Sequence, residues 1–208
     1  MKLYFVRHGE TNSNLQKSVV NFNDELTDNG RKQAQQLAEL ISNISIDIII
    51  TSPHKRAKET AVIISKKVNQ EIQDVTLLGE RKWPSQLEGK LLTDPEVEKY
   101  FNISKEKDNT DPTWHYSDEE NFFDVKKRAK YFIEYVSKLT GSNVLAVSHE
   151  YFIKLILAVM MHGDQLSYEI FRSFFKFTSL SNASLTLCEK EQNNWKLITL
   201  NDQHIWVK

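Results

Sequence analysis

The chain has 208 residues, of which 40% are hydrophobic and 26% are charged, and its formal net charge is −1 at pH 7. This composition predicts one soluble α/β domain spanning residues 1–208 and leaves no basic surplus for binding nucleic acid or an anionic membrane. The single cysteine, Cys188, excludes an intrachain disulfide and a cysteine-based zinc cage.

Nothing in the sequence predicts a membrane segment. The chain begins with a predicted strand, without a basic-then-apolar signal segment before it. The longest apolar-rich stretch, Tyr151–Met161, contains Lys154 and is too short to span a bilayer. We therefore expect a cytoplasmic protein, and the sequence makes no prediction about its oligomeric state.

Strands and helices are expected to alternate along the chain. Apolar runs predict strands over Lys2–Val6, Asp47–Thr51, Asp74–Leu78 and Val144–Ser148, and a late hairpin pairs Ser184–Cys188 with Trp195–Leu200 around Gln192-Asn193-Asn194. Apolar spacing predicts helices over Thr27–Ser42, from Ser52-Pro53 onward, and over Glu120–Leu139, Tyr151–Met161 and Gln165–Phe177. This order predicts a three-layer α/β/α fold with a mostly parallel central sheet.

The region from Lys90 to Glu119 is irregular, with Pro95, Pro112 and many charges. A stretch of this length is typical of a functional flap or insertion, which we place near residues 90–120, and a solvated loop is the alternative. We interpret Lys126-Lys127-Arg128 as a solvated helix face. The late aromatics are interpreted as core or helix interface rather than as a binding site; they are Phe171, Phe174, Phe175 and Phe177.

The most informative motif is Arg7-His8-Gly9-Glu10-Thr11, directly after the first predicted strand. The arginine guanidinium has a planar fork of donors that matches phosphate oxygens. A neutral histidine carries a ring-nitrogen lone pair that can attack a phosphoryl group. The motif therefore indicates a site that binds and transfers phosphate.

Other predicted strand ends supply matching groups. Ser52-Pro53-His54-Lys55-Arg56 follows the second strand, Glu80 the third and His149-Glu150 the fourth. Ligands of doubly wound sheets bind at the carboxyl ends of the strands, so we expect these residues to converge, together with two helix N-termini that favour an anion. Carboxylates with metal-ligand spacing are not clustered there, so the sequence implies no metal.

These motifs resemble those of the histidine phosphatase superfamily, also called phosphoglycerate mutase-like. The resemblance includes the Arg-His-Gly start with Asn14, the Ser52-to-Arg56 segment, Glu80 followed by Glu88-Gly89, and Val147-Ser148-His149. It covers nearly the whole chain except about residues 90–117. The resemblance implies the phosphoglycerate mutase-like fold and a small phosphorylated metabolite as substrate, with no cofactor.

The resemblance also implies a role for each site residue. His8 would be the nucleophile that becomes phosphorylated, and Glu80 the proton donor to the leaving oxygen. Arg7, Arg56 and His149 would form the phosphate pocket, with Asn14 as a supporting residue. A bound dianion would favour the protonated form of Glu80, whereas the neighbouring Arg81 and Lys82 would oppose it.

Departures from the family pattern leave alternatives open. Glu150 replaces the glycine that usually follows the second histidine, and its carboxylate could repel phosphate, act as an extra acid or point away. Trp83-Pro84-Ser85 replaces the Tyr-Gly of the mutase branch. We therefore favour a metal-independent phosphatase working through phosphohistidine. The alternatives are phosphoglycerate mutase-type transfer, or a catalytically weak phosphate-binding or interaction protein.

Overall fold

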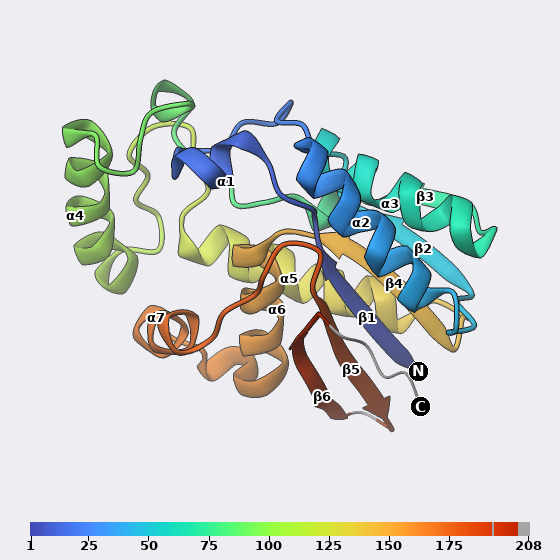
Figure 1. Ribbon diagram of the computed structural model, residues 1–208. Helices are drawn as coiled ribbons and strands as arrows, with labels where there is room; N and C mark the ends of the chain where they lie inside the picture. The colour runs from blue at the N-terminus through green and yellow to red at the C-terminus, as the bar shows by residue number, and fades with distance from the viewer. Residues whose placement is uncertain (193, 204–208) are drawn as a thin grey trace.

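The computed structural model describes residues 1–192 and 194–203, and within them six strands form one sheet in the order β3-β2-β4-β1-β5-β6 (Figure 1). The strands are β1 (Lys2–Arg7), β2 (Ile48–Thr51), β3 (Ile72–Asp74), β4 (Asn143–Ser148), β5 (Leu185–Glu191) and β6 (Asn194–Asp202). The pairings β3-β2, β2-β4 and β4-β1 are parallel, and β5 and β6 extend the sheet in antiparallel pairs. The predicted mostly parallel α/β sheet is confirmed.

Helices cover both faces of this sheet, as expected for parallel strands. Those of the described residues are α1 (Asn12–Gln16), α2 (Asp28–Ile41), α3 (Lys55–Val68), α4 (Pro95–Thr110), α5 (Phe122–Ser137), α6 (Glu150–His162) and α7 (Tyr168–Phe177). One core cluster joins the sheet to α2 and α3, and another joins it to α5 and α6. Figure 1 shows α4 and α7 together on the left, away from the sheet layers.

Alternation along the central strands explains the two cores. Successive side chains of a strand point to opposite faces of the sheet. In β1, Leu3 and Phe5 belong to the core on the α5–α6 side, whereas Tyr4 and Val6 belong to the core on the α2–α3 side. The predicted unbroken apolar run is therefore the signature of a strand with a core on each face.

Two predicted boundaries are wrong. A strand is expected over Asp74–Leu78, but β3 already ends at Asp74, and a 3₁₀ turn over Thr76–Leu78 follows it. The turn buries Val75 and Leu78 in the α5–α6 core, so this apolar run serves the core without extending the sheet. Ser52-Pro53 does not open α3, which begins at Lys55 after His54.

The strands of the predicted hairpin form as β5 and β6, but Asn193 of its turn lies outside the described residues.

The region predicted to be irregular contains the 16-residue helix α4, so the insertion expected near residues 90–120 is helical and the alternative of a loop is wrong. The helix begins with Asp94, whose side chain accepts a hydrogen bond from the Glu96 amide, and with Pro95 in the first turn. Its buried apolar face is narrow, since Val97 and Tyr100 pack in a small separate cluster with Val19 and Leu87. Because α4 carries many charged residues and few buried apolar ones, its sequence does not show the apolar periodicity that predicts a helix.

None of the helices described by the structure combines the length and apolarity that a bilayer crossing requires.

Candidate phosphate site at the strand ends

His8 follows β1 and is 3% exposed. Its Nδ1 lies 2.7 Å from the Gly9 carbonyl oxygen, and its Nε2 lies 3.2 Å from Nε of Arg56. A carbonyl can only accept and an arginine nitrogen can only donate, so Nδ1 carries the proton and Nε2 carries the lone pair. This tautomer directs the nucleophilic lone pair toward the Arg56 guanidinium.

Burial keeps the His8 imidazole neutral. Loss of hydration, followed by the charges of Arg56 and Arg7, holds the pKa of His8 well below its ordinary value. All three effects disfavour the imidazolium form. His8 therefore keeps its lone pair at neutral pH, as a nucleophile requires.

Two glycines allow the loop after β1 to pack against the start of α2. A Cβ on Gly9 would lie 2.4 Å from the Gly30 carbonyl oxygen, and a Cβ on Gly30 would lie 2.2 Å from the Glu10 carbonyl oxygen. Both contacts are with backbone, so neither position has room for a side chain. The Gly9 amide also donates to Thr60 Oγ1 at 3.1 Å, which ties the His8 loop to α3.

Arg56 is fully buried in the first turn of α3. Its Nη1 donates to the Asn21 carbonyl at 2.8 Å, and its Nε donates to His8. Its Nη2 is buried without a hydrogen-bond partner. A buried guanidinium with one free nitrogen is suited to an anionic ligand, because leaving a buried donor unpaired costs free energy.

His149 precedes α6, and its ring centroid lies 5.2 Å from that of His8. Its Nε2 lies 2.8 Å from Ser52 Oγ, which itself accepts the His54 amide at 3.3 Å. Its Nδ1 is buried and unpartnered. Burial and the charge of Arg56 hold the pKa of His149 well below its ordinary value, so the ring is neutral.

Arg7 ends β1 and is tied to Glu150, with Nη1 and Oε2 2.9 Å apart. The other carboxylate oxygen of Glu150 lies 2.6 Å from Nζ of Lys154, which is 2% exposed. Glu150 also lines the cavity described below. The alternative that the Glu150 side chain points away from the pocket is therefore wrong. Its carboxylate lies between two cations.

Glu80 follows the 3₁₀ turn after β3, and its Oε1 accepts the Arg81 amide at 3.0 Å. Burial raises the pKa of this carboxyl, although the charge of Arg56 opposes the shift. Burial is therefore the largest influence on the pKa of Glu80, and it favours the protonated form before any phosphate is bound.

Asn14 lies in α1, and its Oδ1 accepts from the Thr11 amide at 3.2 Å and from Asn182 Nδ2 at 3.0 Å. The same Asn182 nitrogen lies 3.1 Å from the His8 carbonyl oxygen. Asn182 precedes β5 and was not predicted as a site residue. No motif marks it in the sequence, because its place depends on the antiparallel pairing of β5 with β1.

Comparison with known proteins agrees with this geometry. A model of the histidine phosphatase superfamily (branch 1) matches residues 3–203. The chain belongs to the histidine phosphatase superfamily. It is 31% identical over 197 residues to an uncharacterized phosphatase, PhoE, of Bacillus subtilis, covering 94% of this chain and 92% of the relative. An adenosylcobalamin/alpha-ribazole phosphatase of Escherichia coli is 28% identical, covering 76% and 78% of the two chains.

A solved structure has the same fold over its full length. The putative alpha-ribazole-5′-P phosphatase of Escherichia coli aligns with a TM-score of 0.83 and 25% identity, covering 100% of both chains. The phosphoglycerate mutase-like fold expected from the sequence is therefore confirmed.

In this member of the superfamily, the loop that carries Glu80 is held by Arg128 of α5. The Arg128 guanidinium donates to the carbonyls of Leu77 and Gly79 at 2.9 and 2.7 Å, and to both carboxylate oxygens of Glu120 at 2.8 and 2.7 Å. It also donates to the Glu80 carbonyl at 3.3 Å. The interpretation of Lys126-Lys127-Arg128 as a solvated face is therefore wrong for Arg128, whose side chain is 15% exposed.

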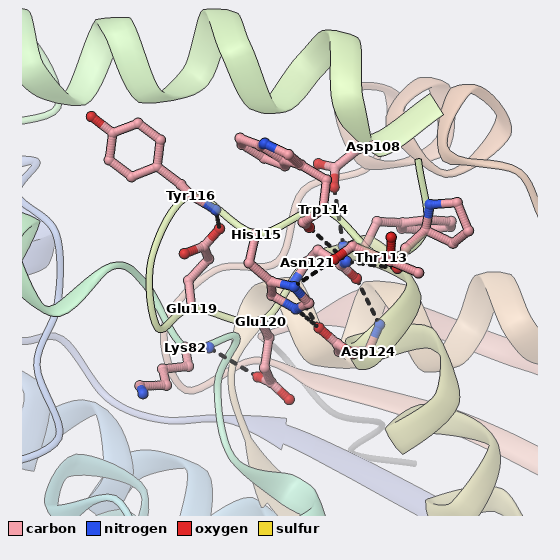
Figure 2. A network of polar contacts seen from close by, with 12 residues as sticks. Lys82, Asp108, Thr113, Trp114, His115, Tyr116, Glu119, Glu120, Asn121 and Asp124 are labelled. Atoms are coloured by element: carbon pink, nitrogen blue, oxygen red, sulfur yellow. Dashed lines mark hydrogen bonds and ion pairs between the residues drawn. The ribbon is translucent and has the colours of Figure 1, made fainter. Parts of the chain in front are cut away.

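A network of hydrogen bonds links residues of the segment between α4 and α5, and Figure 2 shows this network in a close view. Asn121 caps α5 and donates to the carbonyls of Pro112 and Trp114 at 3.0 and 2.9 Å. Glu119 is 5% exposed and accepts the amides of Tyr116 and Ser117. These contacts fix the segment that leads from α4 back to the Arg128–Glu120 pair.

A cavity of about 610 Å³ opens over these residues. Its inner end is lined by five of the six predicted site residues, which are Arg7, His8, Asn14, Arg56 and Glu80. Glu150, for which the sequence leaves several roles open, lines it as well. The ring of His149 adjoins that of His8. The outer part is formed by α4, α6 and α7, including Phe171 and Phe175. The aromatics of α7 therefore line a cavity at two positions. Phe171, Phe174 and Phe175 also pack on the core as predicted, whereas the prediction is wrong for Phe177, which is 91% exposed.

Proposed function

We propose that this protein hydrolyses a phosphomonoester through a phosphohistidine formed on His8. The observation that carries the proposal is that three residues around the His8 ring each have a buried polar atom without a partner: Arg7 Nε, Arg56 Nη2 and His149 Nδ1. Unpaired buried groups are costly, and oxygens of a phosphoryl group would pair all three. The names of the two relatives as phosphatases also support hydrolysis.

In the first step, Nε2 of His8 attacks the phosphorus atom and the bond from phosphorus to the alcohol oxygen breaks. Arg56 gives up its hydrogen bond to Nε2 and donates to the phosphoryl oxygens, together with Arg7. Such positioning and charge stabilisation accounts for most of the catalysis of phosphoryl transfer. The Gly9 carbonyl, which accepts from Nδ1, stabilises the positive charge that develops on the ring.

His149 contributes a donor rather than a charge. Ser52 Oγ accepts the His54 amide and is free to donate its own proton to Nε2 of His149. Nδ1 of His149 then carries a proton that points to the phosphoryl group. Ser52 acts as a positioning residue for this donor.

Glu80 supplies the proton to the alcohol oxygen as it leaves, because burial raises the pKa of its carboxyl and so favours the protonated form. In the second step the Glu80 carboxylate takes a proton from water, the water oxygen attacks phosphorus and the bond to Nε2 breaks. Inorganic phosphate leaves, and His8 and Glu80 return to their first states. No step uses a metal, and no group of three metal-ligating side chains lies together among the described residues.

A rapid-quench experiment with ³²P-labelled phosphomonoester tests the mechanism. In the presence of EDTA, we expect turnover and an acid-labile, base-stable phosphoenzyme that His8→Ala lacks. His162→Ala, at an exposed α6 terminus, is the control that keeps both. A phosphoenzyme of undiminished amount in His8→Ala, or activity restored only by added metal, would overturn the proposal. Transfer to a second alcohol without release of phosphate would indicate a mutase.

A further inference from the structure

The outer part of the cavity lies between α4 and α7, two helices that Figure 1 places on the same side of the molecule. α4 contributes Asn102 and Lys105, and α7 contributes Arg172 and Lys176. A volume of about 610 Å³ is within the range of pockets that enclose whole small molecules. The phosphoryl group alone would leave most of this space empty.

The outer part carries positive charge that the protein does not neutralise. Within the described residues, no carboxylate lies within 4.0 Å of the charged groups of Lys105, Arg172 or Lys176, whereas many other surface cations are paired. The carboxylates that line the cavity are Glu80 and Glu150, both at its inner end. Three like charges around one opening favour an anion there.

Between these cations and His8 lies an aromatic wall. Tyr151 of α6 packs against Phe171 and Phe175 with ring centroids 5.1 and 5.6 Å apart, and Tyr168 and Trp83 line the same cavity. Aromatic faces of this kind accept a planar or apolar body. The Tyr151 hydroxyl is buried without a hydrogen-bond partner, so it offers a donor within this wall.

We propose that the substrate is a phosphomonoester whose alcohol part joins an apolar or ring-shaped body to a second anionic group, which Arg172, Lys176 and Lys105 bind. The inference rests on the proposed phosphatase function and adds the chemical class of its substrate. The phosphoryl group occupies the inner end, the body lies on the aromatic wall and the second anion reaches the opening.

Matched aryl phosphates test this inference. The probes are 3-(4-phosphonooxyphenyl)propanoate, its neutral propanamide, and the corresponding ethylphosphonate, with phenyl phosphate as the reference. Two methylenes separate the second group from the ring, so the leaving groups have nearly equal reactivity. We expect kcat/KM for the propanoate or the phosphonate to exceed that for the amide about tenfold or more, as charge-assisted hydrogen bonds imply. The better of the two identifies the anion as carboxylate or phosphate.

The variant Arg172→Gln/Lys176→Gln should reduce this preference at least fivefold. Lys32→Gln/Lys66→Gln removes two unpaired surface charges from α2 and α3 and should keep the preference. Equal kcat/KM for the acid and the amide in the wild type, or an unchanged preference in the α7 variant, would overturn the inference.

A binding measurement separates this inference from the proposed function. If none of the four phosphates is hydrolysed, the phosphatase proposal fails. Calorimetry with non-hydrolysable phosphonate analogues of the acid and the amide then tests the outer site directly. Tighter binding of the acid that depends on Arg172 and Lys176 supports the site, and equal binding of the two analogues refutes it.

Discussion

Two carboxylates line the inner end of the cavity, and their surroundings give them different properties. Burial raises the pKa of Glu80, which favours the form that can donate a proton. Glu150 lies between Arg7 and Lys154, at 2.9 and 2.6 Å, so each of its two carboxylate oxygens is engaged in an ion pair. Glu80 is therefore the better candidate for the general acid, and Glu150 for a positioning residue that holds Arg7.

Glu80→Gln should slow hydrolysis of alkyl phosphates by about 10²- to 10⁴-fold and that of p-nitrophenyl phosphate far less. The reason is that a poor leaving alkoxide needs the proton, whereas p-nitrophenolate leaves without it. Steady-state kinetics on both substrates provide the measurement. The size-matched Glu150→Gln should affect both substrates equally, through Arg7. The reverse pattern would assign the acid role to Glu150.

Lys154 connects the inner site to α7. Besides Glu150, its ammonium group donates to the carbonyls of Phe175 and Thr178 at 3.2 and 2.8 Å and lies 4.1 Å from the Phe175 ring centroid. A buried ammonium needs all of these partners to offset its lost hydration. The departure from glycine at residue 150 thus provides a carboxylate that this buried lysine requires.

The loop that carries Glu80 depends on α5, the helix that supplies Arg128. Five hydrogen bonds from one guanidinium hold Leu77, Gly79, Glu80 and Glu120 together, and the group lies 4.2 Å from the Phe152 ring centroid. The loop has only the short strand β3 before it, and this side chain anchors it together with Ser148 Oγ, which donates to the Leu78 carbonyl at 2.7 Å. We therefore propose that Arg128 positions Glu80 from outside the cavity.

Arg128→Met should reproduce the leaving-group dependence of Glu80→Gln in weaker form and should destabilise the fold by about 3 kcal/mol, as expected when one partner of a buried ion pair is removed. Kinetics on alkyl and aryl phosphates, together with urea unfolding, measure the two effects. Lys127→Met, one residue away and exposed, should change neither. Loss of stability with an unaltered ratio of the two rates would limit Arg128 to a structural role.

α4 shows why part of the site could not be predicted from the sequence. Its Asp94-Pro95 start is a helix-capping signal, but the proline was interpreted as part of an irregular region. The helix packs on a small cluster away from the sheet, so its sequence lacks the broad apolar stripe of α2, α3 and α5. The outer cavity depends on α4 facing α7, and no local pattern contains that information.

The inner site was predictable because topology determines it. Parallel pairing of β1, β2 and β4 places the ends of these strands at one edge, and the motif residues immediately follow those ends. Asn182 and Arg128 were missed for the opposite reason. Each acts through hydrogen bonds with segments 30 or more residues distant, and their residue types are common on any surface.

The stability of the whole molecule should depend on buried neutral imidazoles. Rings of His8, His149 and His54 lie close together, with centroids 5.2 Å apart for the first pair and 4.8 Å for His149 and His54. Burial and the charge of Arg56 lower the pKa of His54 to about 3, and its Nδ1 has no hydrogen-bond partner. None of the three rings accepts a proton readily in the folded state.

Linkage gives the sign of the resulting pH dependence. Below about pH 6.5 the unfolded chain binds protons at these histidines and the folded chain does not, so acidification favours unfolding. Above that pH neither state is protonated and the effect vanishes. His54 is suited to a test, because its ring packs against that of Phe22 with centroids 4.6 Å apart. A phenyl ring in place of the imidazole would keep an aromatic contact with Phe22.

His54→Phe should therefore unfold with a smaller dependence on pH than the wild type. Relative to the wild type, its free energy of unfolding should rise by about 1–2 kcal/mol between pH 8 and pH 5, because His54 no longer takes up a proton on unfolding. Urea denaturation of both proteins at the two pH values measures this difference. The comparison cancels the contributions of His8, His149 and the carboxyls, which both proteins share. An equal pH dependence would show that His54 is protonated in the folded state, contrary to its burial between Phe22 and His149.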